Sequence, residues 1–289
     1  MLVKKSKDFY SLQILKLSLV MFFSLNISAF AFENQFTKKN IFFLNSVQKN
    51  SKKTKVFLHS THIQLVNTAL DNVLRDLEIR LQDKELRKLK QTFNQAHLYQ
   101  DIFFFFFSKT HFDNCCFAES IEQINQHLMR IESDYFKFAE AIEPKEKQKL
   151  KQAIIFRTGR ILHSVQDFFS HSNYVELMEK KYQKIDEVPV LDFWTKTGQE
   201  EILKLTHSGL ISERFFFSFP HKCPPNSPGE TQLGKDKEQT LAGKRKTNWL
   251  NTKKQNNISG FEAAILLAEK STYNVLFQLF IKYPLLLEN

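Results

Sequence analysis

The chain has few cysteines and no repeat, and these absences narrow the fold and the kinds of metal site. Only three cysteines occur, and they form no CxxC pair, which argues against a cysteine-based zinc knuckle. No internal repeat is present, which excludes a solenoid or propeller. Strand patterns are also weak, so the sequence predicts an all-α fold.

Long apolar runs and dense basic blocks are also missing from most of the chain. Beyond residue 31 no segment is apolar enough over enough residues to cross a bilayer. The formal net charge is +10, yet no basic block with interleaved aromatics marks a nucleic-acid site. A basic surface favours anionic partners, so a phospholipid or membrane surface is one candidate partner. The alternative is that the lysines, which are spread along the chain, only keep the surface solvated.

The first 31 residues have the three parts of a secretory signal. Three lysines open the chain, an apolar core covers 17–25, and Ala29-Phe30-Ala31 is a small-x-small cleavage site. A retained anchor is disfavoured because the apolar run is short and Lys16 interrupts it. The sequence therefore predicts a signal peptide over 1–31 and an exported protein, either secreted or held in the cell envelope.

Export bears on the cysteines, because secreted proteins meet oxidising conditions. Neighbouring cysteines rarely pair with each other, since the geometry is strained. We therefore expect one disulfide, between Cys223 and either Cys115 or Cys116.

Apolar periodicity predicts helices over most of residues 59–289, which we interpret as one domain after an extended lead-in at 32–58. The first helix begins near Ser60 or Thr61. Further helices are predicted over 119–142, from Pro144 to about 177, over 189–207 and over 260–282. The segment at about 220–258 holds four of the seven prolines, which predicts a long surface loop.

Five consecutive phenylalanines at 103–107 form an unusual run. A buried strand, a buried helical turn and a membrane-touching patch are all compatible with it. Because the chain holds 30 phenylalanines, burial in the core is the favoured interpretation.

The strongest chemical pattern is a stripe of His163, Asp167 and His171 within the helix that begins at Pro144. Residues four apart lie above one another on a helix. Imidazole nitrogen and carboxylate oxygen are ligands that zinc accepts, and the flanking residues are apolar, so the stripe should face inward. A metal-free ladder of hydrogen bonds is the alternative.

The length of the stripe limits how it can bind metal. Positions eight apart on a straight helix are separated by about 12 Å, too far for one ion. His163 and Asp167 can therefore share one ion while His171 holds a neighbour, or else His171 lies where the helix ends. Both arrangements favour several ions with a shared carboxylate.

Residues 159–177, GRILHSVQDFFSHSNYVEL, resemble the signature of the heterokaryon-incompatibility Het-C proteins and of the N-terminal domain of von Willebrand factor A-domain-containing protein seven. The early helix at 61–70 and the element His111-Phe112-Asp113-Asn114 resemble further parts of these families. So do Cys223 with Gly234-Lys235-Asp236, and the closing helix at 260–272.

Both groups are similar, more distantly, to the zinc-dependent bacterial phospholipases C and the single-strand-specific zinc nucleases. The resemblance implies a helical bundle with two or three zinc ions that cleaves phosphodiesters. It implies that His62 serves one zinc, that His111 and His163 serve another, that Asp167 bridges them, and that His171 begins a third site. An upstream aspartate is also expected, and Asp101 is the candidate; Asp101 and Asp167 are the expected catalytic carboxylates.

The resemblance also implies a His and Glu four residues apart for the third zinc, and this chain has no such pair after the main helix. The substitutes present are His207, Glu213, Glu262 and Glu269. Three functions follow as hypotheses: a zinc phosphodiesterase acting on phospholipids, a non-catalytic Het-C-like module with a structural metal site, and, less favoured, a nuclease.

Overall fold

A computed structural model of the chain describes residues 59–235, 239–251 and 256–288. The predicted signal peptide (1–31) and lead-in (32–58) lie outside the described residues. The described part is mostly helical, which confirms the all-α prediction. Its α-helices are α4 (His59–Asp76), α5 (Asp83–Phe103), α6 (Ser108–His111), α7 (Phe117–Glu140), α8 (Pro144–His171), α9 (Tyr174–Glu179), α10 (Lys196–His207), α11 (Glu230–Leu233), α12 (Leu241–Lys244) and α13 (Gly260–Lys282).

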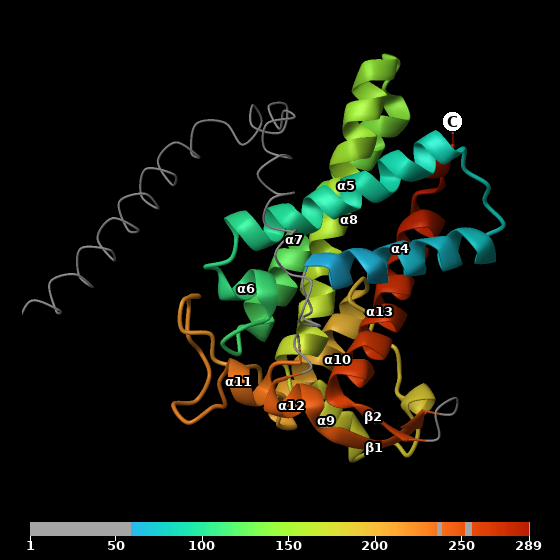
Figure 1. The fold of residues 1–289 in the computed structure, drawn as a ribbon. Coiled ribbons are helices and arrows are strands. Elements are labelled where there is room, and N and C mark those ends of the chain that lie inside the picture. The colour runs from blue at the N-terminus through green and yellow to red at the C-terminus, as the bar shows by residue number, and fades with distance from the viewer. Residues whose placement is uncertain (1–58, 236–238, 252–255, 289) are drawn as a thin grey trace, which may run out of the picture. The chain divides into compact units, whose positions relative to one another are not determined.

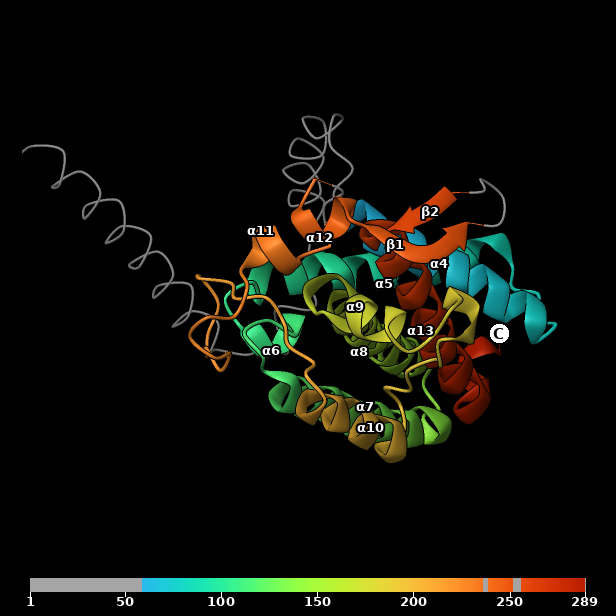
Figure 2. The ribbon, with the colours of Figure 1, turned by 90° about the horizontal axis from the view of Figure 1, so that it is seen from below.

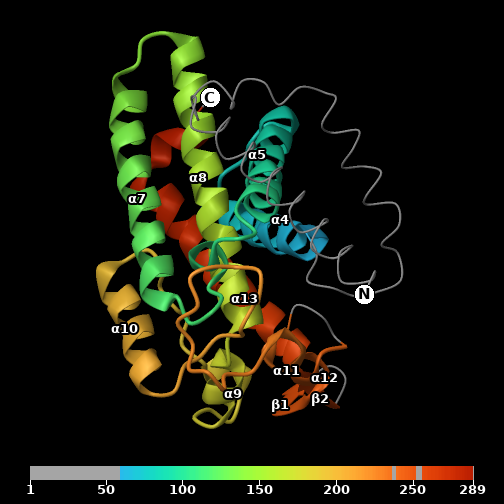
Figure 3. The ribbon, with the colours of Figure 1, turned by 90° about the vertical axis from the view of Figure 1, so that its left-hand side faces the viewer.

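The helix α8 occupies the middle of this arrangement. It packs against α5, α7 and α13, and α13 packs in turn against α4 (Figures 1 and 2). A short connection at 141–143 joins α7 and α8 into a helical hairpin (Figure 3). Fully buried apolar side chains from these helices form the core: Val66, Leu70, Phe93, Ile131, Ile154, Leu162, Phe168, Val275 and Leu276. Side chains of α8 can therefore reach residues from several distant parts of the chain.

Most predicted helices are present, with shifts at their ends. The helix predicted over 260–282 coincides with α13, where Ser259 and Glu262 form a capping box. The main helix was predicted to continue to about 177, but α8 ends at His171 and α9 follows separately. Its end is fixed at Ser172, whose backbone is extended and forms an isolated bridge with Ser212.

The segment at about 220–258 is not the long surface loop that its prolines predicted. It contains α11, α12 and an antiparallel pair of strands, β1 (Lys246–Asn251) and β2 (Asn256–Ser259). Trp249 on β1 is fully buried, and its indole nitrogen donates a hydrogen bond to the carbonyl of Tyr182. Burial of this large aromatic side chain anchors the segment to the helical core.

The favoured interpretation of the phenylalanine run was wrong. The helix α5 ends at Phe103, and the side chains of the last three residues of the run, Phe105, Phe106 and Phe107, are exposed. No helix among the described residues is long and apolar enough to span a membrane. The predicted disulfide is present and joins Cys115 to Cys223, while Cys116 is a buried free thiol.

The helices α5 and α8 approach each other unusually closely at Gly159. A β-carbon added to Gly159 would lie 2.6 Å from the β-carbon of Ala96, which is too close for two carbon atoms. Ala96 has no flexible side chain that could move aside, so the two helix backbones would have to separate. Gly159 is therefore required by this crossing, although glycine disfavours helix formation.

We predict that Gly159→Ala lowers the free energy of unfolding by about 1–3 kcal/mol, the usual cost of overpacking, despite the better helix propensity of alanine. Urea unfolding measures the change. The control is Gln152→Ala, an exposed position on the same helix, which should leave stability within about 0.5 kcal/mol. Unchanged or increased stability of Gly159→Ala would contradict the close approach.

A second buried group, His127 on α7, lies in an unfavourable environment. Its side chain is buried, and among the described residues neither ring nitrogen has a hydrogen-bond partner. Burial, together with the charges of Arg160, Arg157 and Arg130, lowers the pKa of His127 to about 3. The folded protein therefore keeps this ring neutral at pH values where the unfolded chain would protonate it.

Because the pKa of His127 is lower in the folded state than its ordinary 6.5, its contribution destabilises the protein progressively as the pH falls from 6.5 toward 3. In this pH window the titration of His127 should make the free energy of unfolding fall by about 1.4 kcal/mol for each unit by which the pH decreases. We predict that His127→Leu removes this pH dependence. Urea unfolding of both proteins between pH 4.5 and 7.5 tests this. If the free energies of unfolding of the wild type and of His127→Leu depend on pH in the same way, His127 titrates normally. The control is His207→Leu, a substitution of an exposed histidine.

Candidate metal centre

The centre of the site is the carboxylate of Asp167, which is buried among three imidazole rings. Its Oδ2 lies 2.7 Å from Nδ1 of His111 and 3.0 Å from Nε2 of His163. Its Oδ1 lies 3.4 Å from Nε2 of His62. These histidines come from α6, α8 and α4, so one carboxylate joins three separate parts of the chain.

Electrostatics keep Asp167 ionised. Burial alone would raise the pKa of this carboxyl, but the charge of His163 and hydrogen bonds from His111 and His163 hold it well below its usual range. The pKa of His163 is raised in turn: burial lowers it, but Asp167 and Asp101 outweigh that effect. A buried anion of this kind needs positive charge beside it.

His62 differs from its neighbours because its ring is held neutral. Burial, and then the charge on His163, lower the pKa of His62 to about 4. Its Nδ1 lies 2.6 Å from Oε1 of Gln166, whose amide nitrogen donates to Thr272. The amide oxygen of Gln166 therefore selects the tautomer with the proton on Nδ1, and Nε2 presents a lone pair toward Asp167.

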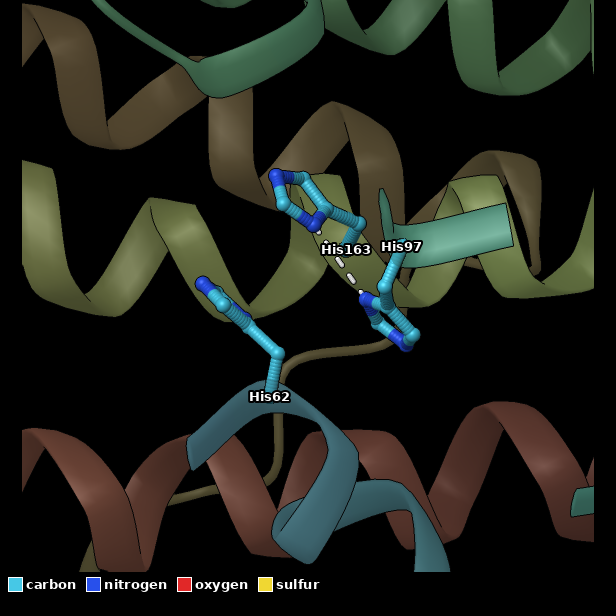
Figure 4. Close-up of side chains that lie close together, drawn as sticks. All are labelled: His62, His97 and His163. Carbon is cyan, nitrogen blue, oxygen red and sulfur yellow. Dashed lines mark hydrogen bonds between the residues drawn. The ribbon is translucent and has the colours of Figure 1, made fainter. Parts of the chain in front are cut away.

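His97 adds a fourth imidazole to the three that surround Asp167. Together with His62 and His163 it forms a group of three buried histidines. Figure 4 shows the three side chains converging, with Nδ1 of His97 3.2 Å from Nδ1 of His163. One nitrogen atom from each residue lies within 4.8 Å of the other two, which is close enough to hold a metal ion. His97 was not among the predicted ligands, although the sequence holds a usable pattern: His97 precedes Asp101 by four residues on α5, the spacing of His163 and Asp167.

Asp101 lies at the edge of the same cluster. Its Oδ1 is 3.2 Å from Nε2 of His163, and its side chain is 36% exposed, whereas those of His163 and Asp167 are nearly inaccessible. Asp101, His111 and His163 form another group with ligand atoms within 4.8 Å. His163 thus faces one group of candidate ligands with Nδ1 and another with Nε2.

His171 belongs to a separate group, with Asp113 and Glu213. Its Nδ1 lies 2.6 Å from Oδ1 of Asp113 and 3.7 Å from Oε1 of Glu213, and the three ligand atoms also fall within 4.8 Å of one another. Burial lowers the pKa of His171, but Glu213 and Asp113 raise it well above its usual value. No sequence pattern joins Glu213 to His171, because 42 positions separate them, and Glu213 was only one of four possible substitutes.

A strained turn after α6 directs His111 and Asp113 into different groups. Phe112 has a φ of 56° and ends α6 in the left-handed region, which non-glycine residues rarely adopt. The buried ring of Phe112 packs edge-on against that of Phe168. This packing holds the turn, so His111 reaches Asp167 while Asp113 reaches His171.

Backbone hydrogen bonds place Glu213. Its amide nitrogen donates to the carbonyl of His171, and its own carbonyl accepts from the amide nitrogen of Asn114. The disulfide between Cys115 and Cys223 lies beside this contact, because the amide nitrogen of Cys115 donates to Ser212. These bonds explain how a loop residue comes to lie beside the end of α8.

The end of α8 is held by Lys235, a fully buried cation. Its ammonium group donates to the carbonyls of Ser172 and Leu233 and lies 3.0 Å from the carboxylate of Glu176. A cation at the C-terminus of a helix is favourable because the unsatisfied carbonyls carry partial negative charge. Lys235 therefore fixes the segment that carries His171.

The structure brings together the residues that the sequence singled out. His62, Asp101, His111, His163 and Asp167 form one cluster, and His171 lies in the neighbouring group at the end of α8. Of the substitutes for the missing ligands, only Glu213 lies near His171; Glu262 instead caps α13, and His207 is exposed at the end of α10. The buried imidazole and carboxylate groups can hold metal ions.

The polar side chains that follow Asp167, those of Ser170, Ser172 and Asn173, bond the backbone and, among the described residues, no imidazole of the cluster. The hydroxyls of Ser170 and Ser172 donate to backbone carbonyls of α8, and Asn173 bonds the backbone of the segment at 209–211. Gln166 is the side chain of α8 that orients the ring of His62.

No protein-family model matches the chain, and no curated protein or solved structure matches it either.

We predict that the two groups bind metal separately. Asp167→Asn should weaken one class of Zn²⁺ sites at least about tenfold and leave the other, while Glu213→Gln should do the reverse, because removing even a supporting partner costs this much. Calorimetric titration and elemental analysis after dialysis measure both classes. Asp186→Asn, an exposed carboxylate distant from both groups in sequence, is the control. Unchanged Zn²⁺ binding in both variants would show that these groups hold no metal.

Proposed function

We propose that the protein is a zinc-dependent phosphodiesterase that acts on phospholipid head groups. The observation that carries the proposal is the orientation of Asp167, whose two oxygens face different sets of histidines. A carboxylate in this arrangement can bridge two ions. The resemblance of residues 159–177 to the Het-C signature, and through it to zinc phospholipases, supports the same assignment.

The ligand chemistry fits zinc. Nitrogen and oxygen donors, buried and close together, are the set that this ion accepts. His62, His97, His111, His163 and Asp167 would hold ions of the first cluster, and Asp113, His171 and Glu213 a further one. Bound zinc ions polarise a phosphoryl oxygen and make water more acidic.

The chain itself supplies the proton acceptor and the access. Asp101 is the most exposed carboxylate of the cluster, and the proton released by an attacking water would move to this carboxylate. Asp167 would stay ionised throughout, because His163 and His111 keep its pKa low. Gln166 would hold His62 in one tautomer.

Export is part of the proposal. The disulfide between Cys115 and Cys223 supports it, since disulfides persist in oxidising compartments.

One observation favours the alternative, a non-catalytic module in which metal only stabilises the fold. The side chains of His62, His111, His163 and Asp167 are 7% exposed or less. Metal bound at such depth would contribute to folding stability directly. The partial exposure of Asp101 and His171, whose side chains are 36% and 17% exposed, is the feature that favours an enzyme over a purely structural metal site.

Activity assays on the purified chain separate these functions. We expect hydrolysis of bis(p-nitrophenyl) phosphate and phosphatidylcholine that is abolished by a chelator and restored by Zn²⁺. Asp101→Asn should lower kcat at least about 100-fold, the contribution of a positioned base, while the melting temperature changes little.

The control for charge removal is again Asp186→Asn, which should retain full turnover. Bound zinc that raises the melting temperature without turnover of either substrate would replace the enzyme proposal with the structural module. Chelator-sensitive hydrolysis of single-stranded nucleic acid alone would point to the nuclease.

A further inference from the structure

Two loops of the chain present a group of phenylalanine side chains to solvent. One is the end of the run at 103–107, and the other covers 215–219. Phe216 is 79% exposed, Phe219 61% and Phe217 59%, far above what a large apolar side chain in a core shows. The exposed members, which we call the Phe surface, are Phe105, Phe106, Phe107, Phe216, Phe217 and Phe219.

The two loops lie side by side although more than 100 residues separate them. Phe107 and Phe219 form a parallel bridge, in which the amide nitrogen of Ser108 donates to Phe219 and that of Phe219 to Phe106. The rings of Phe105 and Phe215 meet edge to face at 5.1 Å. Figures 1 and 3 show the green segment at α6 next to the orange loop that leads to α11.

Asn114 makes the Phe surface rigid. Its fully buried side-chain amide donates to the carbonyls of Phe215 and Ser218, and its side-chain oxygen accepts from the amide nitrogen of Phe215. The hydroxyls of Ser108 and Ser218 point inward and bond this same amide. The loops therefore turn their polar side chains inward and keep phenyl rings outside, so ordering them on binding costs little entropy.

Part of the backbone of these loops is satisfied from within. Hydrogen bonds of the protein are accepted by the carbonyls of Phe104, Phe106, Phe107, Phe215, Ser218 and Phe219. Polar backbone groups that are already bonded can enter an apolar phase without an unsatisfied donor or acceptor. The bonded carbonyls of these loops meet this condition for insertion into lipid.

We infer that the Phe surface docks the protein on a lipid bilayer that contains anionic phospholipid. The rings of the Phe surface carry no polar atoms, whereas a protein–protein interface normally forms several hydrogen bonds. The Phe surface therefore suits lipid better than a protein partner. Rigid apolar rings beside exposed cations suit the boundary between head groups and acyl chains. Lys109, Arg214 and Lys222 flank the two loops and are exposed, although Lys222 also pairs with Glu119.

Docking in this manner also orients the molecule. Asp101 precedes the first loop by two residues, and Glu213 precedes Phe215 by two, so both metal groups contribute residues next to the Phe surface. The inference stands apart from the proposed function, because insertion of the rings requires neither metal nor turnover.

Sedimentation with vesicles tests the inference. Vesicles of phosphatidylcholine with and without phosphatidylserine are mixed with the full chain or with the variant that combines Phe216→Ser and Phe217→Ser. The wild type should bind, more tightly with phosphatidylserine and less tightly at high salt. The variant should bind on the order of tenfold more weakly or worse, because two exposed rings no longer insert.

The matched control combines Phe136→Ser and Ile142→Ser, which removes equally exposed apolar side chains (62% and 92%) from the far part of the α7–α8 hairpin. It should bind as the wild type does. Residues 1–58 are the same in all three proteins, so any difference belongs to the substituted positions. Equal vesicle binding by the wild type, the Phe216→Ser/Phe217→Ser variant and the control overturns the inference. So does a result in which the Phe216→Ser/Phe217→Ser variant changes only the oligomeric state and leaves vesicle binding as it was. Phosphodiesterase activity toward a soluble substrate is measured in parallel, and its loss or retention leaves this result unaffected.

Discussion

The arrangement of this protein depends on a single buried negative charge. Asp167 lies inside the helical core, where an uncompensated carboxylate would be strongly destabilising. Imidazoles from α4, α6 and α8 surround it, and Gln166 holds the ring of His62 in place. The helices are therefore tied together at one polar point as well as by apolar packing, and that point carries the candidate chemistry.

Close packing and polar contacts cooperate around this charge. Gly159 lets α5 approach α8, and on that same face α5 carries His97 and Asp101 to His163. Gln100, between them, bonds the hydroxyl of Ser164 and the carbonyl of Thr110, which links α5 and α8 to the start of the turn that holds His111. A cluster of this kind needs precise helix spacing, because ligand atoms must lie within a few ångströms of one another.

The second group and the Phe surface share one supporting loop system. Asn114 follows the strained turn at Phe112 and bonds both the backbone of Glu213 and the loop of Phe215. The disulfide between Cys115 and Cys223 closes the same region. The backbone of Asn114 thus positions a candidate metal ligand, and its side chain positions the exposed apolar surface, which couples the proposed chemistry to the proposed docking by structure.

The sequence by itself determined the helices and the stripe on α8. Periods of three to four residues reflect local geometry, so α7 and α13 were predicted closely, and the spacing of His163, Asp167 and His171 fixed which of them could share an ion. Only the tertiary structure decided which loop residues join them. Glu213 reaches His171 through backbone hydrogen bonds, and Phe105 to Phe107 face solvent because α5 ends at Phe103. Local periodicity carries no information about contacts between segments a hundred residues apart, since these depend on how whole elements pack.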